Sequence, residues 1–172
     1  MNRRQSLACL SALAGQALFP VVLERFGLAS IALAQDPGAW QPELLSPEQG
    51  RLLAEIVETI IPETDTPGAK AARVHVFVDL VLKHCVPAAE QEAVRQALDG
   101  IGGSFMQSAA PERQAQLARI DADAFRLLKE LTLVGYFTSE IGATRALAYD
   151  AVPGEYRGCI DLQPGQRAWA TR

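Results

Sequence analysis

Cofactor and nucleophile motifs are missing from this sequence of 172 residues. It contains no C-x-x-C-H haem-attachment motif, no paired C-x-x-C for zinc or an iron–sulfur cluster, and no G-x-S-x-G nucleophile elbow. The segment GIGGS at 100–104 resembles a dinucleotide loop only in part, because Phe105 stands where G-x-G-x-x-G needs its third glycine. We expect a helix break there. These absences lower the expectation of an enzyme, although a carboxylate site would leave no local signature.

The two histidines and the acidic residues near them form no catalytic or metal-binding pattern. His75 and His84 are nine positions apart, which places them on opposite faces of a helix, so they cannot chelate one metal ion. His75 and Asp79 are one turn apart without a nearby nucleophile, and we expect a surface contact. Asp65 lies between two threonines, which favours a local backbone cap over a metal or catalytic role. We predict no catalytic, cofactor-binding or metal-binding residue in this chain.

Cysteine is limited to three residues with different expected environments. Cys9 lies near the N-terminus. Cys85 lies on the apolar stripe of an expected helix, where a buried and inert thiol is the usual state. Cys159 lies in a tail punctuated by glycine and proline, where a thiol is reachable. A Cys85–Cys159 bridge, a bridge from Cys159 to a partner chain and two free thiols all remain open, and the interface character of the tail favours the partner bridge.

Basic charge is also limited, and its distribution is uneven. The net charge is -4 over the whole chain, which argues against a nucleic-acid partner. The first 34 residues hold three arginines and one glutamate, a net charge of +2, so the remainder holds 13 basic and 19 acidic side chains, a net charge of -6. The basic charge therefore lies where a targeting signal needs it.

The segment 1–34 has the layout of an export signal. A basic start with Arg3 and Arg4 precedes a mildly apolar stretch, and Ala32 and Ala34 form an A-x-A cleavage site. Adjacent arginines followed by Leu7 indicate the twin-arginine type. This route carries folded proteins, so it suits cargo that receives a cofactor before export. Because the chain has no cofactor motif of its own, we expect the cargo to be a partner.

Other readings of this segment are weaker. A membrane anchor needs about 20 apolar residues, but Pro20 interrupts the apolar run and Glu24 and Arg25 follow it. Asn2 and Ser6 depart from the usual twin-arginine pattern, which leaves the export route less secure than the presence of a signal.

The remainder is predicted to be all-α, because several segments show helical spacing and none shows sustained period-two alternation. We expect a linker at 35–45, a helical domain of about five to six helices at 46–148, and an irregular, extended partner-binding tail at 149–172 that wraps a partner.

The first helix of the domain has a strong start signal. Ser46 is an N-cap, Pro47 occupies the first helical position and Gln49 closes a capping box, whereas Pro62 ends the helix. The following PETDTPGA segment predicts a rigid turn. Further helices are expected at 71–86, 88–99, 111–120 and 125–138. The residues expected on buried faces include Leu52, Leu53, Ile56, Val57, Val74, Phe77, Val78, Val81, Leu82, Cys85, Leu128 and Tyr136.

The tail cannot build a core of its own, because glycine and proline interrupt it at short intervals. Amphipathic aromatic residues on an irregular segment are typical interface anchors. The predicted partner-interface residues are Tyr149, Pro153, Tyr156, Cys159 and Trp169.

Three motifs, together with the Arg3-Arg4 leader, give the chain a family resemblance. They are LSPEQGRLLAEIVETIIPETDTPGA at 45–69, LKELTLVGYFTSEIG at 128–142 and AVPGEYRGCIDL at 151–162. With them the chain resembles the small gamma subunit, or subunit 3, of gluconate 2-dehydrogenase and of related FAD-dependent sugar dehydrogenases.

The resemblance implies a non-catalytic subunit of a periplasmic complex at the inner-membrane surface. A GMC-type flavoprotein subunit would hold FAD and oxidise the sugar, and a multihaem subunit with haem c would accept the electrons. The small subunit would support folding and twin-arginine export of the flavoprotein, and Cys159 would have a covalent role at the interface. Two alternatives remain: a self-standing periplasmic enzyme using His75, Asp79 and Asp65, and a helical protein that binds a small ligand.

Overall fold

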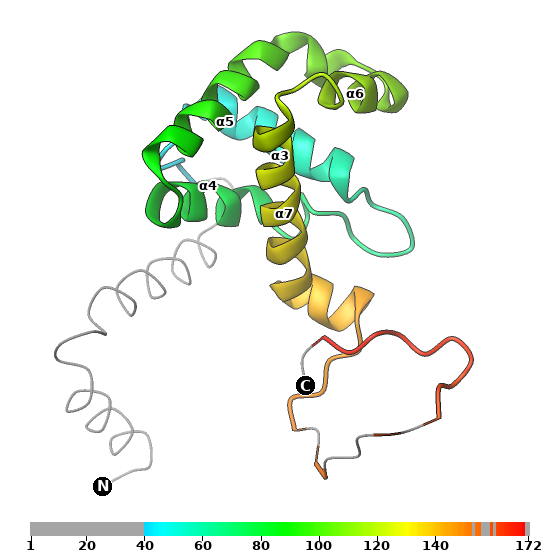
Figure 1. The fold of residues 1–172 in the computed structure, drawn as a ribbon. Helices are drawn as coiled ribbons and strands as arrows, with labels where there is room; N and C mark the ends of the chain where they lie inside the picture. The colour runs from blue at the N-terminus through cyan, green and yellow to red at the C-terminus, as the bar shows by residue number, and fades with distance from the viewer. Residues whose placement is uncertain (1–39, 153, 156–158, 160, 171–172) are drawn as a thin grey trace, which may run out of the picture. The chain divides into compact units, whose positions relative to one another are not determined.

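The computed structural model describes residues 40–152, 154–155, 159 and 161–170. The predicted export signal lies outside these residues. The chain divides into Met1–Trp40 and Gln41–Arg172, and the elements described here belong to the second unit. It is all-α, as predicted, and the described residues contain no strand (Figure 1). The elements are α3 (Pro47–Ile60), α4 (Val74–Cys85), α5 (Ala88–Ile101), the 3₁₀ helix η1 (Gly103–Gln107), α6 (Ala110–Leu117), α7 (Ala122–Thr138) and the π-helical turn η2 (Gly142–Ala146).

Helix α3 begins as its sequence predicts. The amide of Gln49 donates to Ser46 Oγ at 3.1 Å, and the amide of Ser46 donates to Gln49 Oε1 at 3.0 Å, so the capping box is complete. The side-chain amide of Gln49 also donates to Asp99 Oδ1 at 2.7 Å, which joins the start of α3 to α5. The helix ends at Ile60, ahead of Pro62.

The other helix boundaries differ from the predicted ones for local reasons. Helix α4 begins at Val74 instead of near residue 71, because Arg73 has a left-handed backbone with φ of 56°. Helix α5 continues to Ile101, and the break falls at Gly102, whose φ is 67°. Helix α7 begins at Ala122, because Asp121 accepts hydrogen bonds from the first amides and acts as its N-cap.

Helix α7 crosses α3, α4 and α5 and carries one side of the core (Figure 1). Gly135 packs against α4. A Cβ at this position would lie 2.6 Å from Cδ1 of Phe77 and 3.1 Å from Cγ1 of Val74, so a larger residue would have to displace these side chains. The largest fully buried side chains include Leu53, Ile56, Leu82, Leu98, Phe105, Leu128 and Tyr136.

Two predictions for α4 are wrong. Asp79 is fully buried instead of lying in a surface contact with His75. Its carboxylate accepts the amides of Glu43 at 2.7 Å, Leu44 at 3.3 Å and Leu45 at 3.1 Å, and so fastens the segment before α3 to α4. Burial raises the pKa of the Asp79 carboxyl above its ordinary value, while the three amide donors act in the opposite direction.

Cys85 is exposed instead of buried. It is the last residue of α4, and the chain leaves the helix at Val86, so the apolar stripe has ended where the thiol lies. The buried side of α4 also differs from the predicted one. Val76 and Leu80, which were not predicted, are buried, whereas Phe77 and Val81, which were predicted to be buried, are only partly buried.

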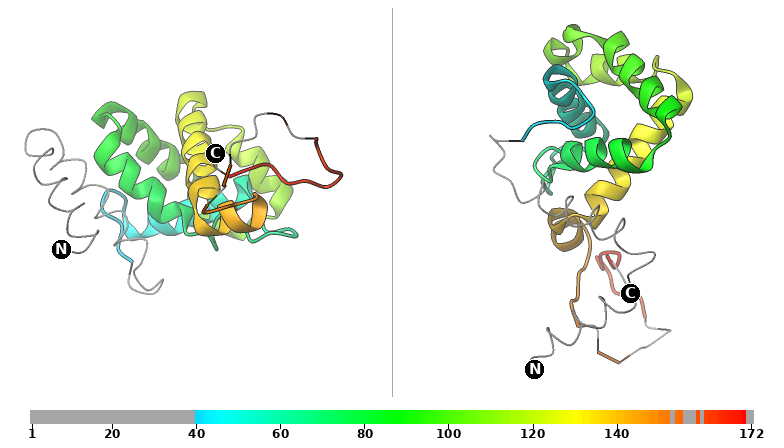
Figure 2. Two further views of the ribbon diagram at one scale, coloured as in Figure 1. Left: turned by 90° about the horizontal axis from the view of Figure 1, so that it is seen from below. Right: turned by 90° about the vertical axis from the view of Figure 1, so that its left-hand side faces the viewer.

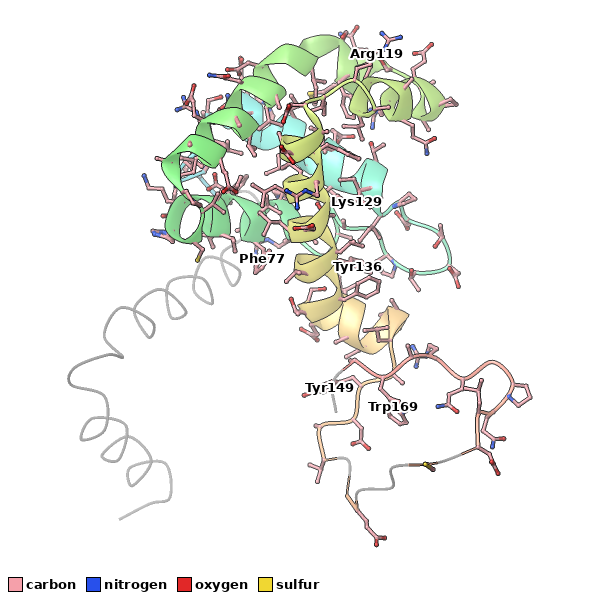
Figure 3. All side chains as sticks on the ribbon, viewed as in Figure 1. Phe77, Arg119, Lys129, Tyr136, Tyr149 and Trp169 are labelled. Atoms are coloured by element: carbon pink, nitrogen blue, oxygen red, sulfur yellow. The ribbon has the colours of Figure 1, made fainter. Side chains whose placement is uncertain are left out.

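The loop between α3 and α4 is held at both ends. The Tyr136 hydroxyl, on α7, donates to the carbonyl oxygen of Pro67 at 2.7 Å, and Figure 3 shows the Tyr136 ring pointing toward this loop. The Glu58 carboxylate accepts the amides of Glu63 at 2.9 Å and Lys70 at 2.8 Å. A Cβ at Gly68 would overlap the Glu58 carboxylate, so a larger residue there would displace the side chain that accepts these two amides.

Within this loop Asp65 is exposed and its carboxylate accepts from the Thr64 hydroxyl at 2.9 Å. The contact is local, as predicted, but the donor is a neighbouring side chain instead of a backbone amide. Tyr136 itself is 2 % exposed and belongs to the core, which confirms the prediction.

Replacing Tyr136 with Phe should lower the free energy of unfolding by about 1–3 kcal/mol, because the Pro67 carbonyl loses its donor while the ring still packs. Chemical denaturation monitored by circular dichroism measures this change. The control is Tyr149→Phe, on an exposed ring, for which we expect less than about 0.5 kcal/mol. Equal stability of Tyr136→Phe and the unaltered chain would show that this bond does not hold the loop.

Candidate partner-binding site

The chain turns sharply at the end of α7. The Ser139 hydroxyl accepts the amide of Gly142 at 3.0 Å and caps the turn. A Cβ at Gly142 would lie 1.9 Å from the backbone oxygen of Tyr136, so no other residue fits without moving the main chain. This turn leads into η2 and fixes where the C-terminal segment leaves the helices.

The predicted tail returns to its own starting point. The Ala148 amide donates to Ala168 O at 2.8 Å, and the Ala170 amide donates to Ala148 O at 2.9 Å, which makes an isolated parallel bridge between Ala148 and Trp169. We call the described residues between 148 and 170 the C-terminal loop. Figures 1 and 2 show it beyond the C-terminal end of α7, on the side away from α5 and α6.

Apolar side chains of this loop are exposed. Val152 and Leu162 are each 81 % exposed, Tyr149 is 54 % exposed and Trp169 is 38 % exposed. Tyr149 and Trp169 lie close to each other where the loop begins and ends (Figure 3). Apolar residues this exposed on a segment without a core indicate a binding surface. Two predicted interface residues, Pro153 and Tyr156, lie outside the described residues.

A second exposed apolar patch lies on α7 and was not predicted. Leu133, Val134 and Phe137 are 38 %, 51 % and 40 % exposed. They occupy the side of α7 opposite Leu128 and Gly135, and this outer side is charged only in the first half of the helix. The signal was present in the sequence, because apolar residues continue on both faces of α7 after Glu130.

The two described cysteines are free and exposed. Cys159 is reachable, as predicted, and lies midway along the C-terminal loop. The Cys85–Cys159 bridge is not formed in the structure. A bridge from Cys159 to a partner and two free thiols remain as the alternatives.

The residues weighed for catalysis have structural contacts of their own or, for His75, a neutral ring. Burial, assisted by the charges of Arg73 and Lys70, lowers the pKa of His75 to about 4, so its ring is neutral at pH 7. His84 Nε2 lies 2.9 Å from Glu43 Oε2, and Asp79 is occupied by backbone amides. Surface depressions of about 470, 420 and 340 Å³ are lined without His75, Asp79 or Asp65. Among the described residues no group of three His, Cys, Asp or Glu could hold a metal ion.

Glu55 has a structural role of the same kind. It accepts from Lys70 in the α3–α4 loop and from Arg113 Nη1 on α6 at 2.9 Å. These two cations, Lys70 foremost, hold the pKa of the Glu55 carboxyl below its usual value. The carboxylate is therefore ionised at neutral pH and ties the loop and α6 to α3.

Within the part of the chain that the structure describes, no helix has the length and apolar character needed to cross a membrane.

The fold and the exposed loop define a small all-α domain with a surface suited to a protein partner. Residues 47–154 match the family described as Gluconate 2-dehydrogenase subunit 3. The match covers more than half of the chain, so the chain belongs to this family, as the resemblance predicted. Searches of curated proteins and of solved structures found no match. Membership implies a subunit of a multisubunit dehydrogenase complex.

Both described thiols should react in the native protein. In the reduced full chain carrying Cys9→Ser, we expect an aromatic disulfide reagent to titrate two thiols without denaturant, because Cys85 and Cys159 are both exposed. Cys85→Ser and Cys159→Ser should each remove one. A Cys85 thiol that reacts only after denaturation would contradict the position described for the end of α4.

Proposed function

We propose that this chain is the non-catalytic small subunit of a periplasmic FAD-dependent dehydrogenase of the glucose or gluconate type. It binds the GMC-type flavoprotein that carries FAD and oxidises the sugar. A multihaem cytochrome c subunit of the same complex takes the electrons onward. Family membership supports the subunit role, and the exposed C-terminal loop supports binding to another chain.

The loop is the observation that carries this proposal. Burying a large apolar side chain contributes about 1.5–3 kcal/mol, and Tyr149, Val152 and Leu162 are more than half exposed in the free chain. Binding must also offset the lost freedom of two molecules and of the side chains that become ordered. Several such residues on one loop, with the apolar patch on α7, supply enough surface for a specific contact.

Cys159 adds a covalent contact with the flavoprotein. Its thiol lies midway along the exposed loop, without a disulfide partner among the described cysteines. Joining it to a partner cysteine removes two electrons and two protons from the two thiols, and a disulfide of the periplasmic oxidising system accepts them by thiol–disulfide exchange. The resulting bond would keep the subunits together when the noncovalent contact is transiently lost.

Folding and export belong to the same proposal. The N-terminal segment of 34 residues carries the twin-arginine layout, and the flavoprotein would cross the membrane folded, with FAD inserted, while bound to this subunit. The segment that follows the leader is tied to the folded domain, because Asp79 binds the amides at 43–45. A leader joined in this way to a folded domain suits export of a folded complex.

The test is co-expression of the full chain with the flavoprotein of its own organism. We expect the flavin-coloured flavoprotein to co-purify and a higher-mass band to appear on non-reducing gels. Reductant and Cys159→Ser should remove this band, whereas Cys85→Ser, the matched control, should leave it.

Co-purification without the higher-mass band would keep the subunit role and remove the covalent link. If the chain purifies alone as a stable protein without the flavoprotein, this result would contradict the proposed function.

A further inference from the structure

The ends of the C-terminal loop are joined at a narrow neck. The neck consists of the bridge between Ala148 and Trp169 and of its two backbone hydrogen bonds, at 2.8 and 2.9 Å. Bringing together the ends of a loop this long has an entropic cost. Exposed backbone hydrogen bonds contribute little net stability, because water competes for the same groups. The bridge therefore needs a further contact to hold it closed in water.

Arg167 supplies that contact. Its Nη1 donates to the carbonyl oxygens of Arg145 at 2.6 Å and Thr144 at 3.2 Å. These carbonyls lie in the last part of η2, where acceptors remain without helical partners and the peptide dipoles favour a positive charge. Both bonds are exposed, like those of the neck, but a charged donor makes shorter and stronger hydrogen bonds than a neutral one. Arg167 thus joins the C-terminal end of the loop to η2, the element that precedes the loop.

The residues before Arg167 hold it in position. Gln163-Pro164-Gly165-Gln166 forms a turn in which the Gln166 amide donates to Gln163 O at 3.0 Å, and Gly165 has φ of 75°. Proline followed by glycine with positive φ is the pattern of a type II turn. The Gln166 side chain also accepts the Gln163 amide at 3.1 Å, which strengthens the turn. Because two hydrogen bonds between Gln163 and Gln166 hold the turn, Arg167 loses little conformational entropy when it contacts η2.

We propose that Arg167 is the latch that closes the neck of the C-terminal loop in the free subunit, so that the flavoprotein meets Tyr149 and Trp169 already brought together at the neck. The inference rests on the proposed function for the identity of the partner, whereas the latch itself is a property of the free chain. A neck that is closed before contact loses less entropy on binding, which favours association. Arg167 is a positioning residue in this scheme, and the exposed apolar residues make the contact.

The first measurement concerns the free, reduced full chain. Amide exchange followed by nuclear magnetic resonance should show the Ala148 and Ala170 amides protected. Arg167→Ala should lower their protection by about tenfold or more, because opening of the neck controls exchange. Arg167→Lys keeps the charge but loses the planar donor group and should give an intermediate value. The control Arg95→Ala, at an exposed arginine on α5 paired with Glu92, should change neither amide.

The second measurement uses the same variants in a Cys159→Ser background, so that only noncovalent binding is observed. Association of the purified flavoprotein with the immobilised chain should slow by about tenfold for Arg167→Ala, with partial recovery for Arg167→Lys. Thermal unfolding of the helical part should not change. General destabilisation of the domain would instead lower the unfolding temperature of Arg167→Ala and of Arg167→Lys alike.

Each other outcome counts against a definite part of the proposal. Unprotected Ala148 and Ala170 amides in the unaltered chain, or protection that survives Arg167→Ala, would overturn the latch. An open neck with an unchanged association rate would overturn its part in docking. If the unaltered chain binds no flavoprotein, the proposed function and the docking step fail, while the amide exchange still decides whether Arg167 closes the loop.

Discussion

The hydrogen bond from the Tyr136 hydroxyl to the Pro67 carbonyl is the contact on which the arrangement of this domain depends. It joins α7 to the α3–α4 loop across 69 positions of sequence. This end of α7 contains Gly135, which packs against Phe77 and Val74 of α4, and is followed by Gly142, whose missing side chain lets the chain turn back on Tyr136. The position of the C-terminal loop follows from these contacts. The motifs IPETDTPGA and GYFTSEIG, far apart in the sequence, therefore meet where the α3–α4 loop contacts the C-terminal end of α7.

Local signals in the sequence predicted much of the helical fold. Ser46 and Gln49 form their capping box within one turn, so the start of α3 was readable from four neighbouring residues. The surface contact predicted for Asp79 is wrong for the opposite reason, because its hydrogen-bond partners lie 34 to 36 positions away and no local pattern reveals them. Cys85 was placed on a buried stripe that ends with α4 itself. Helical periodicity predicts which face of a helix is apolar, but it does not show how far along the helix other elements cover that face.

The candidate site shows the same limit. Exposure of Tyr149, Cys159 and Trp169 agrees with the expectation of a tail that lacks a core. The return of the tail to Ala148 depends on a pairing between residues 20 or more positions apart, which composition cannot show. The apolar patch on α7 was not predicted, because sequence alone does not show whether apolar residues on a second face of a helix are covered. Together the loop and the patch give this family member two exposed apolar surfaces and, among the residues described, no assembled metal site.

The most direct test of a partner-binding subunit is to remove the loop and keep the helical domain. Residues 149–168 would be replaced by a short Gly-Ser linker in the full chain, which would be co-expressed with the flavoprotein and purified by a tag on the small subunit. The ratio of flavin absorbance to small subunit is the measurement, with circular dichroism to verify the helices. We expect an unchanged helical spectrum and loss of most of the flavin. Flavin recovery equal to that of the unaltered chain would contradict the claim that the C-terminal loop holds the partner.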